Sequence, residues 1–163
     1  RRTLSGVLRV HIQEHARVAV VTFSDNTHGY LAMNGRLILV EEANDQELGQ
    51  EDASMFRVRW ERDAPPVGAV VLHSNDMRAM LEFWSAFTSR SIALTPRTIL
   101  VASEDSHDYT LVAHNGTHVQ FTTSESIDAQ LTKLSAALQD RDQRNESRPR
   151  RVDVRFGDRV YLE

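Results

Sequence analysis

The sequence predicts an α+β fold in which a mostly antiparallel β-sheet carries about two helices packed on one face. Several segments alternate apolar and polar residues, which is the period of a half-buried strand. Two segments, beginning near residues 74 and 124, repeat apolar residues with the period of a helix instead. Along the chain the elements follow the order strands, helix, strand, hairpin, helix and terminal hairpin, which is typical of an α+β layout.

Composition excludes some classes of protein. The 163 residues are 40% hydrophobic and 26% charged, which is ordinary for a globular domain, and the formal charge of -4 argues against a protein built mainly to hold nucleic acid. Cysteine is absent, so disulfides, thiolate metal sites and thiol catalysis are excluded. Arg1 is not a natural start, so we expect a piece of a longer protein, and the absence of a membrane-spanning segment here says nothing about that longer protein.

The first third of the chain reads as strands and one hairpin. Apolar residues alternate over residues 8–12, and a denser β-branched run covers residues 18–23, which predicts two strands or one long bent strand. Asn34-Gly35 predicts a two-residue type I′ turn between strands over residues 30–40. Residues 41–52 are rich in Asp and Glu, which favours a solvated loop over a cation-binding one because their spacing does not match an EF-hand. Residues 55–60 alternate again and predict another strand.

A helix is expected from Ser74 or Asn75 as the N-cap, with Asp76 complementing the helix dipole. Its apolar face is predicted to consist of Met77, Met80, Leu81, Trp84 and Phe87. Such a stripe of methionine and aromatic residues is typical of a core-facing helix. Residues 98–102 then return to the pattern of a strand.

The second half predicts a hairpin over residues 109–121, turning at Asn115-Gly116, and then a second helix. Ser124 is the expected cap of that helix, and its apolar face is expected to hold Ile127, Leu131, Leu134 and Leu138. Residues 139–151 are almost wholly polar and contain five arginines. This stretch is interpreted as a linker or, alternatively, as a basic tract that steers an acidic partner toward the adjacent strand.

The last fifteen residues predict a terminal hairpin. Val152, Val154 and Phe156 alternate with Asp153 and Arg155, and Gly157-Asp158 can turn the chain into a second strand at residues 160–162. A strand at the edge of a sheet presents unpaired backbone groups, which makes it a template for a partner strand.

These residues resemble those of a known family. Residues 152–156 are similar to the closing strand of the bacterial cell-division proteins of the FtsQ/DivIB family. The pattern of Leu8, Val10, Ile12 and Glu14 is similar to the family's junction between its POTRA domain and its β domain, although His15 and Arg17 stand where Arg and Pro are usual. Further similarity lies in residues 116–121 and in Lys133-Leu134. The hairpin over residues 30–40 also has a counterpart in the family, with Ala32 in place of the usual Asp.

The resemblance implies that residues 1–19 end with the last strand of a POTRA-like domain and that residues 20–163 form an FtsQ/DivIB-like β domain. It implies a non-catalytic, extracytoplasmic scaffold, tethered to the bacterial inner membrane by a single span, that binds the FtsB and FtsL proteins and helps regulate septal peptidoglycan synthesis. The implied partner-binding residues are Val152, Asp153, Val154, Arg155, Phe156, Gly157, Arg159, Val160, Tyr161 and Leu162.

Arg155 has two interpretations at this point. It can grip a carboxylate of the partner in a bidentate manner, with Phe156 and Tyr161 as aromatic anchors beside it. Alternatively it pairs internally with Asp153, which lies two residues away on the same face of the strand.

Two other functions remain open: an unrelated α+β binding module and a metal-dependent hydrolase. The hydrolase would have to be built on His114 and His118, which flank the second Asn-Gly turn, with His107 and Asp108 a strand length away. Signature motifs of serine hydrolases, zinc proteases, P-loop proteins and dinucleotide-binding proteins are absent from the sequence. The sequence therefore predicts no enzyme, no cofactor and no bound metal.

Overall fold

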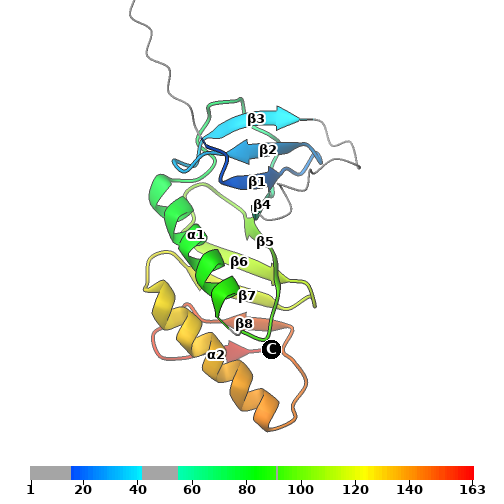
Figure 1. Ribbon diagram of the computed structural model, residues 1–163, viewed down its shortest axis with the longest axis vertical. Helices are drawn as coiled ribbons and strands as arrows, with labels where there is room; N and C mark the ends of the chain where they lie inside the picture. Colours follow the sequence, from blue (N-terminus) through cyan, green and yellow to red (C-terminus); the bar gives the residue numbers. More distant parts are fainter. Residues whose placement is uncertain (1–15, 42–54, 91) are drawn as a thin grey trace, which may run out of the picture.

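The computed structural model describes residues 16–41, 55–90 and 92–163, and these form one nine-stranded sheet with two helices (Figure 1). The strands lie in the order β3-β2-β1-β4-β5-β6-β7-β8-β9. The α+β class and the element order are confirmed. The elements are β1 (Ala19–Thr22), β2 (His28–Leu31), β3 (Leu37–Glu41), β4 (Phe56–Trp60), α1 (Ser74–Ser89), β5 (Pro96–Val101), β6 (Asp108–Ala113), β7 (His118–Thr122), α2 (Ile127–Gln143), β8 (Arg151–Asp153) and β9 (Tyr161–Leu162).

The pairing explains why both helices lie on one face of the sheet. Most neighbouring strands are antiparallel, but β4–β5 and β7–β8 are parallel pairs, and each is joined by a helix. β4 and β7 run in the same direction, because β5, β6 and β7 alternate, and both crossovers step the same way along the sheet. Right-handed crossovers of this kind place α1 and α2 on the same side (Figure 1). A third parallel pair joins β1 and β4.

Both Asn-Gly hairpins form, but the predicted type I′ turn is wrong. Gly35 has φ 73° and Gly116 has φ 85°, whereas Asn34 and Asn115 do not have positive φ. Each glycine N–H donates to the carbonyl three residues earlier, at 2.9 and 3.0 Å. Each asparagine Oδ1 accepts from the backbone N–H two residues later, at 3.2 and 3.1 Å. These are three-residue loops with the glycine in the left-handed region, and the asparagine side chain stabilises that alternative.

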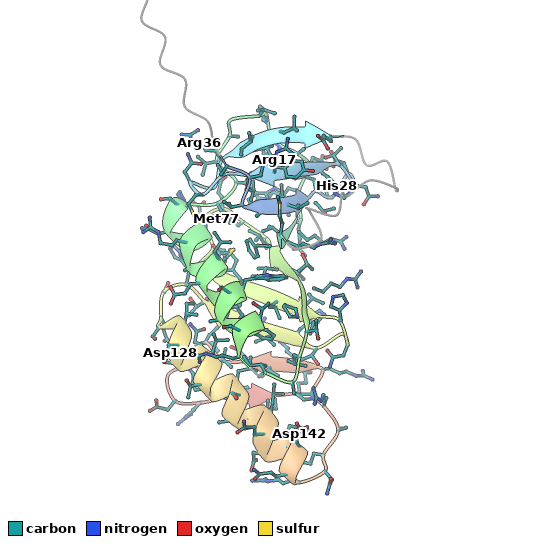
Figure 2. All side chains as sticks on the ribbon, in the orientation of Figure 1. Arg17, His28, Arg36, Met77, Asp128 and Asp142 are labelled. Atoms are coloured by element: carbon teal, nitrogen blue, oxygen red, sulfur yellow. The ribbon has the colours of Figure 1, made fainter. Side chains whose placement is uncertain are left out.

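Helix α1 packs its apolar face on the sheet, with a correction to the predicted face. Met77, Met80 and Phe87 are buried as predicted, but Leu81 and Trp84 are only partly buried, and Phe83, which was not predicted, is fully buried. Phe83 stacks on Phe121 of β7 with ring centroids 3.9 Å apart. Figure 2 shows Met77 near the N-terminal end of this helix.

The start of α1 also differs from the prediction. The N-cap is His73, whose side chain makes no capping hydrogen bond, so neither Ser74 nor Asn75 caps the helix. Asp76 is buried, and its carboxylate accepts from the Thr123 hydroxyl and lies 3.0 Å from Nδ1 of His107. It therefore ties the helix to two loops of the sheet in addition to lying near the helix dipole.

Helix α2 has the predicted buried face and a different cap. Ser126, rather than Ser124, accepts from the backbone N–H of Ala129 at 3.3 Å. Gln130 is buried with the apolar residues, and its amide bonds both the N–H and the carbonyl of Thr122.

The predicted linker over residues 139–151 is partly wrong, because α2 runs to Gln143. Its last turns are stabilised by pairing within the stretch: Arg144 lies 3.0 Å from Asp140, one helical turn away, and Arg141 donates to the carbonyl of Ser147. Figure 2 places Asp128 near the start of α2 and Asp142 near its end.

Two sequence predictions lie outside the described residues: the strand at residues 8–12 and most of the acidic loop. β1 begins at Ala19, next to the expected domain boundary. Neither helix in the described part of the chain is long and apolar enough to cross a lipid bilayer.

Candidate protein-interaction edge at the C-terminus

At the C-terminal edge of the sheet the outermost strand is β9, and β8 lies inside it; the strand at the opposite edge is β3. β8 pairs with β7 in parallel and with β9 in antiparallel orientation, with Val152 opposite Leu162 and Asp153 opposite Tyr161. Val152 and Val154 are fully buried, and Asp153 is 9% exposed. The side chains of these three residues of the predicted binding set are therefore not accessible to a partner, because the two valines belong to the hydrophobic core and the Asp153 carboxylate is bonded to Arg155.

The hydrogen bonds of β9 show which backbone groups face outward. Glu163 N–H donates to the Arg151 carbonyl at 3.0 Å, and Arg151 N–H donates to the Glu163 carbonyl at 3.2 Å. The next residue, Leu162, lies opposite Val152 in a pair without mutual hydrogen bonds. Its N–H and C=O therefore point away from β8, toward the position of an added strand.

The exposed apolar groups of the described residues include three that gather at this edge, which we call the terminal aromatic patch: Phe156, Tyr161 and Leu162, at 53%, 52% and 37% exposure. The two rings meet edge to face with centroids 6.0 Å apart. Phe156 was expected on the face of the buried valines, but β8 ends at Asp153 and the chain turns the ring outward.

A short turn holds the patch in place. Gly157 has φ 43°, and Arg159 N–H donates to the Phe156 carbonyl at 2.9 Å, so the predicted Gly157-Asp158 turn is confirmed. Val160 is half-buried against the core, which fixes the return of the chain into β9.

Arg155 forms the centre of a polar cluster on the helix-free face. Its Nε and Nη2 donate to the two carboxylate oxygens of Asp153 at 2.9 and 2.7 Å, and its Nη1 donates to Asp108 at 2.7 Å. Nη2 also lies 3.2 Å from the Gln120 side-chain oxygen. Of the two interpretations of Arg155, the structure shows the internal pairing with Asp153.

The ionisation of this pair follows from the contacts. Burial alone would raise the pKa of Asp153, but the hydrogen bonds and charge of Arg155, with a contribution from Arg151, outweigh it and hold that pKa below its ordinary value. The hydrogen bond with Asp153 in turn raises the pKa of Arg155. The guanidinium also lies over the Phe156 ring, 5.1 Å from its centroid, so Arg155 contacts the terminal aromatic patch through a cation–π interaction.

Sequence reasoning missed the residues that anchor this loop. Lys133 of α2 donates to the Val154 carbonyl at 2.7 Å and to the Gly157 carbonyl. Gln120 of β7 bonds both Arg155 and Arg151. Alternation with Val119 and Phe121 does place Gln120 on the helix-free face, but only the β7–β8 pairing brings it to Asp153.

A hollow of about 590 Å³ lies beside the end of β9. It is lined by Asn115, Gly116, His118, Arg150, Arg151 and Glu163. Arg150 and Arg151 of the predicted basic tract thus lie next to the edge strand, whereas Arg141, Arg144 and Arg148 form ion pairs with acidic residues of the same stretch.

The histidines of the hydrolase alternative are not brought together. His114 and His118 are exposed on the β6–β7 hairpin, and His107 lies at the opposite end of β6 against Asp76. Among residues 16–41, 55–90 and 92–163, the structure has no group of three or more His, Cys, Asp or Glu side chains that could hold a metal ion.

Neither protein-family models nor curated proteins give a match to this chain.

Proposed function

We propose that this domain is a non-catalytic scaffold that accepts a β-strand of a partner protein along β9. The observation that carries the proposal is the combination at one edge: outward backbone groups at Leu162 and the terminal aromatic patch beside them. Ladder hydrogen bonds supply affinity in this binding mode, and side-chain anchors supply specificity. Large exposed aromatic groups are the side chains most often found at the energetic centre of an interface.

We further propose that the scaffold acts in bacterial cell division, as the resemblance to the FtsQ/DivIB family implies. Residues 1–19 would then contain the last strand of a POTRA-like domain and residues 20–163 the β domain. The domain would lie on the extracytoplasmic side of the inner membrane, bind FtsB and FtsL, and help regulate septal peptidoglycan synthesis.

The positions of the family-like residues support this proposal. Residues 116–121 lie in the β6–β7 turn and β7, Lys133 fixes the loop before β9, and residues 152–156 lead from β8 to the aromatic patch. The three segments are distant in sequence, and all of them build or adjoin the same edge.

The test uses a proline at the outward backbone position. Leu162→Pro removes the N–H that an added strand would need, while the hydrogen bonds to β8 made by Arg151 and Glu163 remain available. Leu162→Ala is the matched control, because it shortens the side chain and keeps the N–H. With the FtsB segment from the same genome, we expect Leu162→Pro to weaken binding about tenfold or more relative to Leu162→Ala.

Circular dichroism and thermal melting of both variants establish that the fold is kept. Equal affinity of the two variants would contradict strand addition at β9. A wild-type domain that shows no affinity for FtsB, yet captures another extended peptide through β9, would favour the unrelated α+β binding module. No contact in the described residues favours the metal-dependent hydrolase.

A further inference from the structure

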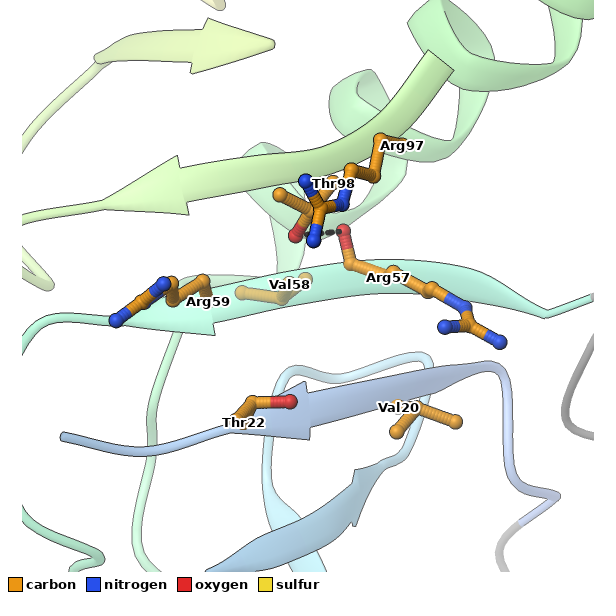
Figure 3. A pocket seen from close by; sticks show the side chains of 7 residues that line it. All are labelled: Val20, Thr22, Arg57, Val58, Arg59, Arg97 and Thr98. Carbon is orange, nitrogen blue, oxygen red and sulfur yellow. Dashed lines mark hydrogen bonds between the residues drawn. The ribbon is translucent and has the colours of Figure 1, made fainter. Parts of the chain in front are cut away.

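A second surface, on the helix-free face near β1, carries three arginines around a hollow. The hollow has a volume of about 210 Å³ and lies across β1, β4 and β5 (Figure 3). It is lined by Val20, Thr22, Arg57, Val58, Arg59, Arg97 and Thr98. We call this surface the arginine hollow. It is separate from the C-terminal edge, because β6, β7 and β8 lie between β5 and β9.

Alternation along β4 places two of these arginines. Phe56, Val58 and Trp60 are buried on the helix-covered face, so Arg57 and Arg59 project from the opposite face. Figure 3 shows their guanidinium groups pointing toward opposite ends of β4. Two positive charges therefore flank the hollow along the strand direction.

An irregularity in β5 supplies the third arginine. Pro96 pairs with Ala113 and Thr98 pairs with Val112, so Arg97 is an extra residue between two successive pairs of the ladder. In unbroken alternation Arg97 would share the face of Ile99 and Val101, which are both fully buried. Instead its side chain is exposed and lies beside Thr98 above the hollow (Figure 3). The bulge thus turns a charged side chain from the core side to the arginine hollow.

No residue in the described part of the chain neutralises these charges. Within the described residues, the side chains of Arg57, Arg59 and Arg97 make no ion pair or hydrogen bond, and no Asp or Glu lines the hollow. This contrasts with Arg155, which pairs with two carboxylates. Positive charge is therefore concentrated here on a chain whose formal net charge is -4. Such a field attracts an anion and raises its local concentration.

We propose that the arginine hollow binds a phosphoryl group of a small anionic ligand. A guanidinium group presents planar, paired N–H donors that match phosphate oxygens. A phosphoryl group carries a charge of about -1.5 to -2 near neutral pH, so it balances three guanidinium groups better than a single carboxylate does. The hollow is smaller than the roughly 300 Å³ at which pockets for drug-sized ligands begin, which fits one phosphate or a diphosphate.

The experiment titrates the domain with inorganic phosphate, pyrophosphate and acetate by calorimetry and by NMR chemical shifts. We expect saturable binding with one site per chain, strongest for pyrophosphate and weakest for acetate. Arg57→Gln and Arg97→Gln should each weaken pyrophosphate binding about tenfold, because each removes one charge-assisted pair. Arg78→Gln on α1 is the matched control, since Arg78 is exposed and lies outside the hollow.

Each other outcome overturns the proposal. Absence of saturable pyrophosphate binding to the wild-type domain, or equal weakening by Arg78→Gln, would show only a general attraction of surface charge. Tighter binding of an acidic peptide such as oligoglutamate than of pyrophosphate would overturn the phosphoryl assignment. The substituted arginines are half-buried or exposed, so unchanged circular dichroism is expected and is checked for each variant.

Discussion

Replacing Arg155 by methionine tests whether this residue is structural, as its contacts indicate. Methionine keeps much of the apolar stem and removes the guanidinium that holds the carboxylates of Asp153 and Asp108. Breaking a fully buried pair by removing one partner costs about 3 to 5 kcal/mol. Here the side chains of Arg155 and Asp153 are 20% and 13% exposed, which lowers the expected loss in free energy of unfolding to about 2 to 3 kcal/mol.

The assay is urea unfolding followed by circular dichroism and tryptophan fluorescence. For a domain of this size the loss corresponds to a melting temperature lower by about 5 to 10 °C. Arg159→Met is the matched control, because Arg159 is exposed on the same loop and its change should stay within about 0.5 kcal/mol. A double-mutant cycle with Asp153→Asn should give a coupling energy of at least about 1 kcal/mol.

The pH dependence supplies a separate readout. The pKa of Asp153 is lowered in the folded state, so its stabilising contribution is present above the unfolded pKa of about 3.9 and is lost as pH falls through the folded pKa. The advantage of the wild type over Arg155→Met should therefore shrink in that acidic range. Equal stability of Arg155→Met and Arg159→Met near neutral pH would refute the structural role.

Other elements allow further tests, each by urea or thermal unfolding. Phe83→Ala should lower the free energy of unfolding by about 3 to 5 kcal/mol. This loss should exceed that of Trp84→Ala, because of the two side chains only Phe83 is fully buried. The reverse order would contradict the packing of α1. Gly116→Ala should cost about 1 to 2 kcal/mol for its positive φ. Gly35→Ala should lower the free energy of unfolding by clearly more than Gly116→Ala, because the new Cβ would lie 1.9 Å from the Leu72 carbonyl oxygen, whereas the space around Gly116 is open. The hydrogen bond with the buried Asp76 carboxylate raises the pKa of His107. The free energy of unfolding that His107→Gln removes should therefore be larger at about pH 5.5 than at about pH 8. A difference that does not change with pH would argue against the ion pair between His107 and Asp76. Metal analysis of the purified domain should find no stoichiometric zinc; one zinc per chain that is lost on His114→Ala would contradict this.

The local sequence determined most of the elements. Period-two alternation predicted the strands at residues 55–60, 109–113 and 118–121, and the helical stripe of α2 matches its buried face. The local sequence did not determine the turn type, because Asn-Gly suits both a two-residue turn and the three-residue loop that the asparagine side chain stabilises. On α1 the helical period could not decide whether Phe83 or Trp84 is the buried residue, because the stacking partner of Phe83, Phe121, lies on a strand later in the chain.

For the candidate site, the sequence by itself determined that a short apolar strand containing Tyr161 follows the turn at Gly157-Asp158. Only the tertiary structure decided that β8 is interior and β9 is the edge, and that Arg155 is occupied by Asp108 and Gln120, which lie 47 and 35 residues away. It also decided that a bulge aims Arg97 at the arginine hollow. The physical reason is the same in each case: local periods fix which face of a strand a side chain occupies, whereas strand order and register fix which distant side chains share that face.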